Sequence, residues 1–85
     1  MAVEQTSMLA YRTLQRTLGE RQARVLGVIG SYARLNNREI AEYSGLPINC
    51  VTPRVLELRR LGLVEPSIIV TDTVTHRKTI TWRVV

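Results

Sequence analysis

The sequence predicts a mainly α-helical domain that ends in a small β-hairpin, in the order helix, helix, helix, helix, strand, strand. Two observations support this fold class. Up to Gly62, apolar residues recur at the spacing of helices that bury one face. After Gly62, apolar and polar residues alternate, which is typical of half-buried strands. A chain of 85 residues is long enough for one modest core, so we expect a single domain over 1–85.

The first helix is predicted to begin near Ser7, a favourable N-cap, and to end at Gly19. Its apolar residues, Tyr11, Leu14 and Leu18, follow one another at helical spacing. They either pack on the second helix or form the seam of a homodimer.

The second helix is predicted to begin at Glu20, where an acidic side chain favours the positive end of the helix dipole. Arg34 would then lie in its last turn, and Asn36 would close it. The apolar stripe expected on this helix consists of Val25, Leu26, Ile29, Tyr32 and Ala33.

The third helix is short and is predicted over 38–43. Asn36 and Glu39 have the spacing of a capping box, in which each side chain bonds the backbone N–H of the other residue. Gly45 is expected to end this helix in a left-handed conformation, which glycine adopts without steric cost.

The fourth helix is predicted to end at Gly62, and Pro53 constrains its start. Proline lacks a backbone N–H, so it fits best in a first helical turn. Either Thr52 is the N-cap, or the helix begins near Asn49 with one hydrogen bond missing. The stripe expected to be buried consists of Val51, Val55, Leu58 and Leu61.

The hairpin is predicted from the alternation in its two strands. Pairing Ile68 with Trp82 and Val70 with Ile80 would place all four side chains on one face, with Trp82 as the anchor in the core. The tip would then lie within 73–77. In addition, Leu63 and Val64 are enough for a short extra edge strand.

The charge of the chain indicates a polyanionic partner. It has 12 basic and 7 acidic residues, a net charge of +5 and an isoelectric point near 10.4. All the basic residues except Lys78 are arginines, whose planar fork of donors suits phosphates and base edges. Such a balance is typical of nucleic-acid binding, although a basic surface also serves solubility alone.

Other functions find little support in the sequence. A single cysteine, Cys50, excludes an internal disulfide and suits a reducing compartment. His76 has no further ligand at metal-binding spacing, and no phosphate-binding glycine loop is present. We therefore expect no enzyme, metal or cofactor. The longest apolar run, 25–30, is far below the roughly 18 residues of a membrane span, so we expect no membrane partner.

The segment NNREIAEYSGLPINCVTPRVLELRRLGLVEP resembles the winged helix-turn-helix DNA-binding proteins of bacteria, archaea and their phages, in particular small phage and prophage proteins. The similarity extends to AYRTLQRTLGERQARVLGVI upstream and RKTITWRV downstream. It implies an N-terminal helix over 1–18, a tri-helical core over 19–62 and a wing hairpin over 63–85. The core implied for the tri-helical unit consists of Ile40, Ala41, Leu46, Val51, Val55, Leu58 and Leu63.

The resemblance also implies a DNA-binding surface, because the second motif helix of such folds enters the major groove. Asn49 is either a contact to adenine or an N-cap, and Arg54 either contacts guanine or phosphate or pairs with Glu57. Arg59 and Arg60 either meet phosphates or are ordinary solvated charges. The full set of candidates is Ile48, Asn49, Thr52, Pro53, Arg54, Arg59 and Arg60 on the recognition helix, and His76, Arg77 and Lys78 on the wing.

We therefore predict sequence-dependent binding of double-stranded DNA by a small cytoplasmic transcriptional regulator of prokaryotic or phage origin. The sequence differs from the family pattern at two positions of the expected DNA-binding surface. Relatives often have glycine at the wing tip, where this chain has His76. Leu56 falls on the exposed side of the recognition helix, where it either packs on a thymine methyl or marks a protein contact. The alternative function is therefore a protein-interaction module that modifies a host or partner protein.

Overall fold

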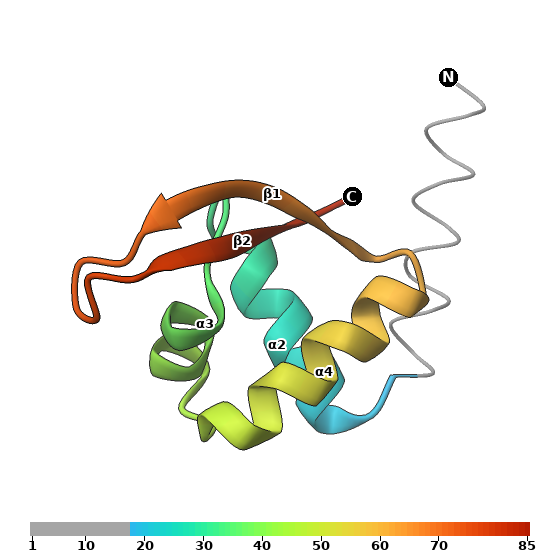
Figure 1. The fold of residues 1–85 in the computed structure, drawn as a ribbon. Helices are drawn as coiled ribbons and strands as arrows, with labels where there is room; N and C mark the ends of the chain where they lie inside the picture. Colours follow the sequence, from blue (N-terminus) through green and yellow to red (C-terminus); the bar gives the residue numbers. More distant parts are fainter. Residues whose placement is uncertain (1–17) are drawn as a thin grey trace.

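In the computed structural model, which describes residues 18–85, helices precede an antiparallel pair of strands, as predicted (Figure 1). The helices lie beneath the sheet, and the hairpin extends beyond them at one end (Figure 1). The predicted first helix, with Tyr11 and Leu14, lies outside the described residues, whereas Leu18 is half-buried against the core. The elements are α2 (Glu20–Gly30), α3 (Asn37–Ser44), α4 (Ile48–Arg60), β1 (Val64–Thr71) and β2 (Lys78–Val84).

Helix α2 begins at Glu20 as predicted, but it ends at Gly30, so the expected extension through Ala33 is wrong. Ser31 caps the helix, and its hydroxyl donates to the Gly27 carbonyl at 2.8 Å. Tyr32 and Ala33 are consequently exposed rather than part of the buried stripe. The chain leaves the helix early because it must be extended by residue 35, where it joins the sheet.

Helix α3 has the predicted capping box. The Asn36 side chain accepts from the Glu39 N–H at 2.8 Å, and the Glu39 carboxylate accepts from the Asn36 N–H at 3.0 Å. Gly45 ends the helix with a φ of 73°, in the left-handed region where a side chain is strained. Both local predictions for this element are confirmed.

Helix α4 begins at Ile48, with Pro47 as its N-cap, so the predicted start near Asn49 holds and Thr52 is not the cap. Pro53 lies inside the helix and removes the backbone donor to the Asn49 carbonyl. The residues predicted to be buried are buried, except that Leu61 at the C-cap is 45% exposed.

The predicted strand register is wrong. Pro66 lies opposite Trp82 and Ile69 opposite Ile80, with an irregularity between Pro66 and Ile69. Trp82 is fixed by the core, where it is 8% exposed, whereas Ile68, Ile69 and Ile80 are exposed. The hairpin projects past the helices, so residues near its tip have no core to face (Figure 1).

The short extra strand also lies elsewhere than predicted. Val64 is the first residue of β1, and the additional pairing is made by Leu35, on the other edge of β2. Its N–H donates to the Trp82 carbonyl at 3.0 Å, and its carbonyl accepts from the Trp82 N–H at 2.7 Å. This bridge ties the segment between α2 and α3 to the hairpin.

The core lies between the three described helices and the sheet. Of the core residues that the resemblance implied, Ala41 and Leu46 are half-buried and the others are buried. No helix within 18–85 is long and apolar enough to cross a membrane. The buried hydrophobic residues are Val25, Leu26, Ile29, Leu35, Ile40, Val51, Val55, Leu58, Leu63, Val64 and Trp82.

Candidate nucleic-acid interface

Helix α4 presents one face to the core, two flanks to neighbouring elements and one face to solvent. Its buried face carries Val51, Val55 and Leu58. At 100° per residue, Arg54 and Glu57 fall on the flank beside α2 and Arg59 falls on the flank beside the sheet. The outward face of α4, as we use the term below, consists of the exposed residues Asn49, Thr52, Pro53, Leu56 and Arg60.

Arg54 is bound to Glu57, so the structure shows the ion pair with Glu57 that the sequence offered as the alternative to a DNA contact. Its Nε and Nη2 donate to the two carboxylate oxygens at 2.7 and 2.9 Å. Gln22 of α2 donates to the same carboxylate at 2.9 Å. The hydrogen bond to Glu57 raises the pKa of Arg54, and the bonds from Arg54 and then Gln22 lower the pKa of Glu57. The only acidic side chain of α4 is thereby neutralised, and Arg54 is directed along the α2 flank.

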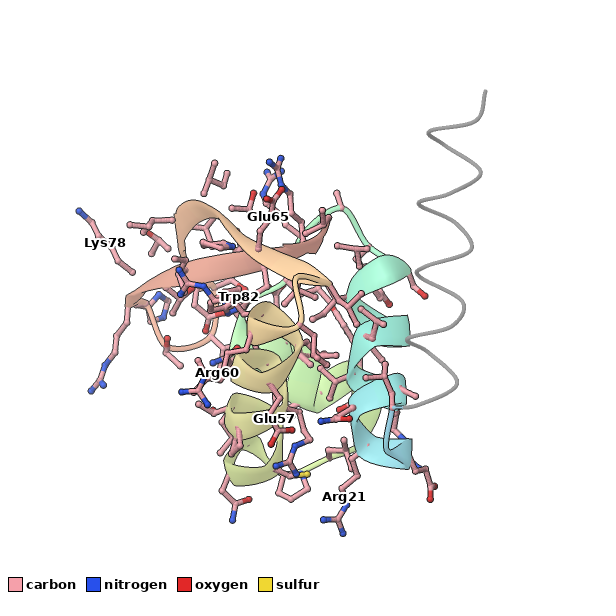
Figure 2. The ribbon with its side chains drawn as sticks, turned by 90° about the vertical axis from the view of Figure 1, so that its right-hand side faces the viewer. Arg21, Glu57, Arg60, Glu65, Lys78 and Trp82 are labelled. Carbon is pink, nitrogen blue, oxygen red and sulfur yellow. The ribbon has the colours of Figure 1, made fainter. Side chains whose placement is uncertain are left out.

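Arg59 and Arg60 occupy the last turn of α4 without an acidic partner. The Arg59 guanidinium lies over the Trp82 ring, 5.6 Å from its centroid, which is within cation–π range. Arg60 projects from α4 on the side of the molecule that also carries Lys78 (Figure 2). Within residues 18–85, no carboxylate lies within 4.0 Å of either arginine.

The wing tip is the turn over 72–77 between β1 and β2, which carries His76 and Arg77, and Lys78 is the first residue of β2. All three side chains are exposed. The Asp72 N–H donates to the Arg77 carbonyl at 2.8 Å, and the His76 N–H donates to the Asp72 carbonyl at 2.9 Å. His76 has a φ of 59°, the conformation that glycine usually supplies. A histidine therefore occupies the left-handed position of the turn at which relatives often have glycine.

Asp72 anchors this turn, although the sequence pattern did not single it out. Its buried carboxylate accepts from Arg38 at the start of α3, from the Asn36 side chain at 3.0 Å and from the Thr75 N–H at 2.9 Å. These bonds, first of all the one from Arg38, hold the pKa of Asp72 far below its usual range. An aspartate at the start of a polar turn is a recognised turn signal, but its pairing with Arg38 is visible only in the fold.

Arg21 is a second residue that the sequence pattern did not single out. A shallow hollow beside the N-terminal end of α4 is lined by Arg21 together with Asn49, Pro53 and Arg54. Arg21 lies at the lower end of the molecule in the view of Figure 2, away from the wing. The α4 surface is therefore flanked by cations at both ends.

The distribution of charge follows from these contacts. Every acidic side chain within residues 18–85 accepts a hydrogen bond from a neighbouring arginine or from a capped backbone N–H. The cations that have no such partner in this part of the chain include Arg59, Arg60, Arg77 and Lys78, at the end of α4 and at the wing tip. These cations form two groups, one at the end of α4 and one at the wing, which lie toward opposite ends of the molecule in Figure 1. Arg60 and Lys78 project toward the same side of the molecule in Figure 2, while Arg54 remains on the flank, bound to Glu57.

In the described part of the chain, 18–85, three helices followed by a hairpin, with a left-handed glycine between α3 and α4, define a winged helix-turn-helix fold. Solved structures share this fold. ZitR of Lactococcus lactis is 20% identical with a TM-score of 0.63, covering 100% of this chain and 62% of that one. The adhesin competence repressor AdcR of Streptococcus pyogenes is 18% identical with a TM-score of 0.62, covering 99% and 59%. The transcriptional regulator PA4135 is 17% identical with a TM-score of 0.65, covering 99% and 60%.

The chain thus spans about three fifths of the length of these structures. At such identities the likeness establishes the fold and leaves the function to be argued from the site. No family model and no curated protein matches the sequence.

Proposed function

We propose that this chain binds double-stranded DNA in a sequence-dependent manner and acts as a small transcriptional regulator. The observation that carries this proposal is the exposed outward face of α4 together with four cations, Arg59, Arg60, Arg77 and Lys78, that have no carboxylate partner within residues 18–85. Arg60 and Lys78 project toward the same side of the molecule (Figure 2). Phosphates attract such a surface, and an α-helix fits the major groove of B-form DNA.

In this mode α4 enters the major groove and the wing follows the adjacent backbone. Arg59, Arg60, Arg77 and Lys78 neutralise phosphates and supply most of the affinity. Asn49, exposed in the first turn of α4, offers the amide pair that bonds adenine. Arg54 contacts DNA only after it leaves Glu57, because its guanidinium donates two hydrogen bonds to the Glu57 carboxylate that must first break.

The names of the structural neighbours support the regulatory role. One is called a repressor and another a transcriptional regulator. Two come from bacteria, which supports a prokaryotic origin and a cytoplasmic location, whereas the phage origin rests on the sequence resemblance alone. A homodimer remains part of the proposal, since two-fold symmetry would match a palindromic DNA site.

The test is fluorescence anisotropy with the full chain and duplexes enriched by in vitro selection. Contact with four phosphates predicts that affinity falls roughly 100-fold between about 50 and 200 mM salt. Arg60→Ala should weaken binding to all sequences and lower the salt slope by about 1.

Arg83→Ala is the matched control, because it removes the same charge from the Glu65 pair on the upper side of the sheet, away from α4 (Figure 2). It should leave the slope unchanged. Absence of binding at about 50 mM salt, or equal effects of the two substitutions, would contradict the proposal.

A further inference from the structure

The middle of the outward face of α4 offers mainly apolar groups. Leu56, in the middle of the helix, is 44% exposed. Ile48, at the start of α4 and outside this face, is 51% exposed. Pro53, also exposed, offers only ring methylenes. Burial of these side chains against an apolar group would be favourable.

Hydrogen-bonding groups are scarce in the same region. The Thr52 hydroxyl donates its hydrogen to the Ile48 carbonyl at 3.2 Å, which leaves its oxygen as an acceptor and its methyl group for apolar contact. Arg54, the cation nearest to these residues in sequence, is held by Glu57 on the α2 flank. The middle of α4 therefore has little with which to recognise the donors and acceptors of a base edge.

The polar residues of the outward face lie at its two ends. Asn49 is in the first turn and Arg60 in the last, about 16 Å apart along the helix axis at 1.5 Å per residue. Between them, the face consists of Thr52, Pro53 and Leu56. Whatever fills this central stretch must offer an apolar group between two polar ones.

We propose, on the basis of the proposed function, that α4 discriminates between bases by contacting the C5 methyl group of a major-groove pyrimidine with Leu56, supported by Thr52 and Pro53. The C5 methyl is the apolar group that a base pair presents in the major groove. Thymine and 5-methylcytosine both carry it. The occupant is DNA rather than a protein surface, because Arg59 and Arg60 beside this stretch match the phosphates that border the groove.

The experiment uses the full chain and two random duplex libraries, one unmodified and one methylated at cytosine C5. Enriched sites are then synthesised with deoxyuridine for thymidine, which deletes the methyl group and keeps base pairing. We expect about a fourfold loss of affinity for each contacted methyl group, equivalent to about 0.8 kcal/mol. A loss in the uracil duplex identifies thymine as the source, whereas enrichment only from the methylated library identifies 5-methylcytosine.

Matched leucine variants test which side chain makes the contact. Leu56→Ala should bring the thymine and uracil duplexes to equal affinity. Leu61→Ala removes a leucine of the same exposure, 45%, at the C-cap of the same helix, and should preserve the difference.

Enriched sites that bind equally with and without the methyl group would overturn this inference and leave DNA binding intact. Failure of both libraries to enrich any duplex would overturn the inference and the proposed function together.

Discussion

The Nε of Arg38 donates to both carboxylate oxygens of Asp72, at 3.0 and 2.9 Å. Arg38 lies in the first turn of α3, and Asp72 begins the turn of the wing. The same carboxylate accepts from Asn36, the residue that caps α3. A single buried carboxylate therefore fixes the wing relative to the helix-turn-helix unit, and with it the distance between Lys78 and the α4 arginines.

Replacing Asp72 with Asn should destabilise the fold at neutral pH, and the deficit should shrink in acid. The pKa of Asp72 is lowered in the fold, so its ionised form favours folding. That contribution is complete above the ordinary pKa of 3.8 and is lost as the pH falls toward the lower value of the folded state. Thermal unfolding followed by circular dichroism from pH 7 to pH 2 measures the difference between the two proteins.

The control for Asp72→Asn is Glu65→Gln, which removes one acidic charge from a pair that is largely exposed. Exposed pairs contribute little, so its stability should follow that of the unmodified chain closely. A deficit of Asp72→Asn that stays constant over the whole pH range would argue against this role of Asp72.

Leu58 and Leu56 lie two positions apart on α4 and should respond very differently to alanine. Leu58 is fully buried, so Leu58→Ala should lower the free energy of unfolding by about 2–5 kcal/mol. Leu56 is 44% exposed, so Leu56→Ala should change it by no more than about 0.5 kcal/mol. Urea unfolding gives both values, and similar losses would mean that the outward face of α4 is assigned wrongly.

Local sequence patterns predicted the two ends of α3, because each end depends only on residues that are close together in the sequence. The capping box of Asn36 and Glu39 and the left-handed Gly45 each involve a few consecutive positions, so spacing was enough to predict them. The end of α2 was not predictable in this way. Apolar spacing continued through Tyr32, but Tyr32 stacks on Tyr43 at a centroid distance of 4.8 Å outside the core.

Contacts between segments that are distant in the sequence could not be predicted from the sequence pattern. The alternation in the sequence indicated two strands but not their buried face, because Thr81 and Trp82 are both buried and Ile80 is exposed. The register depends on the anchoring of Trp82 by Leu35 and on the irregularity after Pro66. The same holds for the candidate site. The exposure of Asn49 and Arg60 followed from the helical period, whereas the partner of Asp72 required the packing of the wing against α3.

Replacing His76 with glycine should stabilise the wing. A non-glycine residue in the left-handed region costs about 1–2 kcal/mol, and His76 has a φ of 59°. Part of this gain is offset by the greater freedom of glycine in the unfolded chain, so we expect the free energy of unfolding to rise by about 1 kcal/mol. His76→Val should lower it instead, because a β-branched residue is strained there. Paired urea titrations test the order, and a less stable glycine variant would contradict it.

Replacing Glu57 with Gln should strengthen binding to DNA of any sequence. The substitution removes the carboxylate that holds Arg54 at 2.7 and 2.9 Å, so the guanidinium becomes free to reach a phosphate. One additional phosphate contact steepens the salt dependence by about 0.9 and raises affinity roughly eightfold near 100 mM salt. Anisotropy titrations with a random duplex at several salt concentrations measure both quantities.

Glu65→Gln is the control for this last change, because it alters the net charge equally. Glu65 lies on the upper side of the sheet, away from α4, whereas Glu57 lies on α4 itself (Figure 2). A general effect of charge would raise the affinity of both variants alike. Release of Arg54 would raise the affinity of Glu57→Gln alone, and a further Arg54→Ala substitution in that variant should abolish the gain.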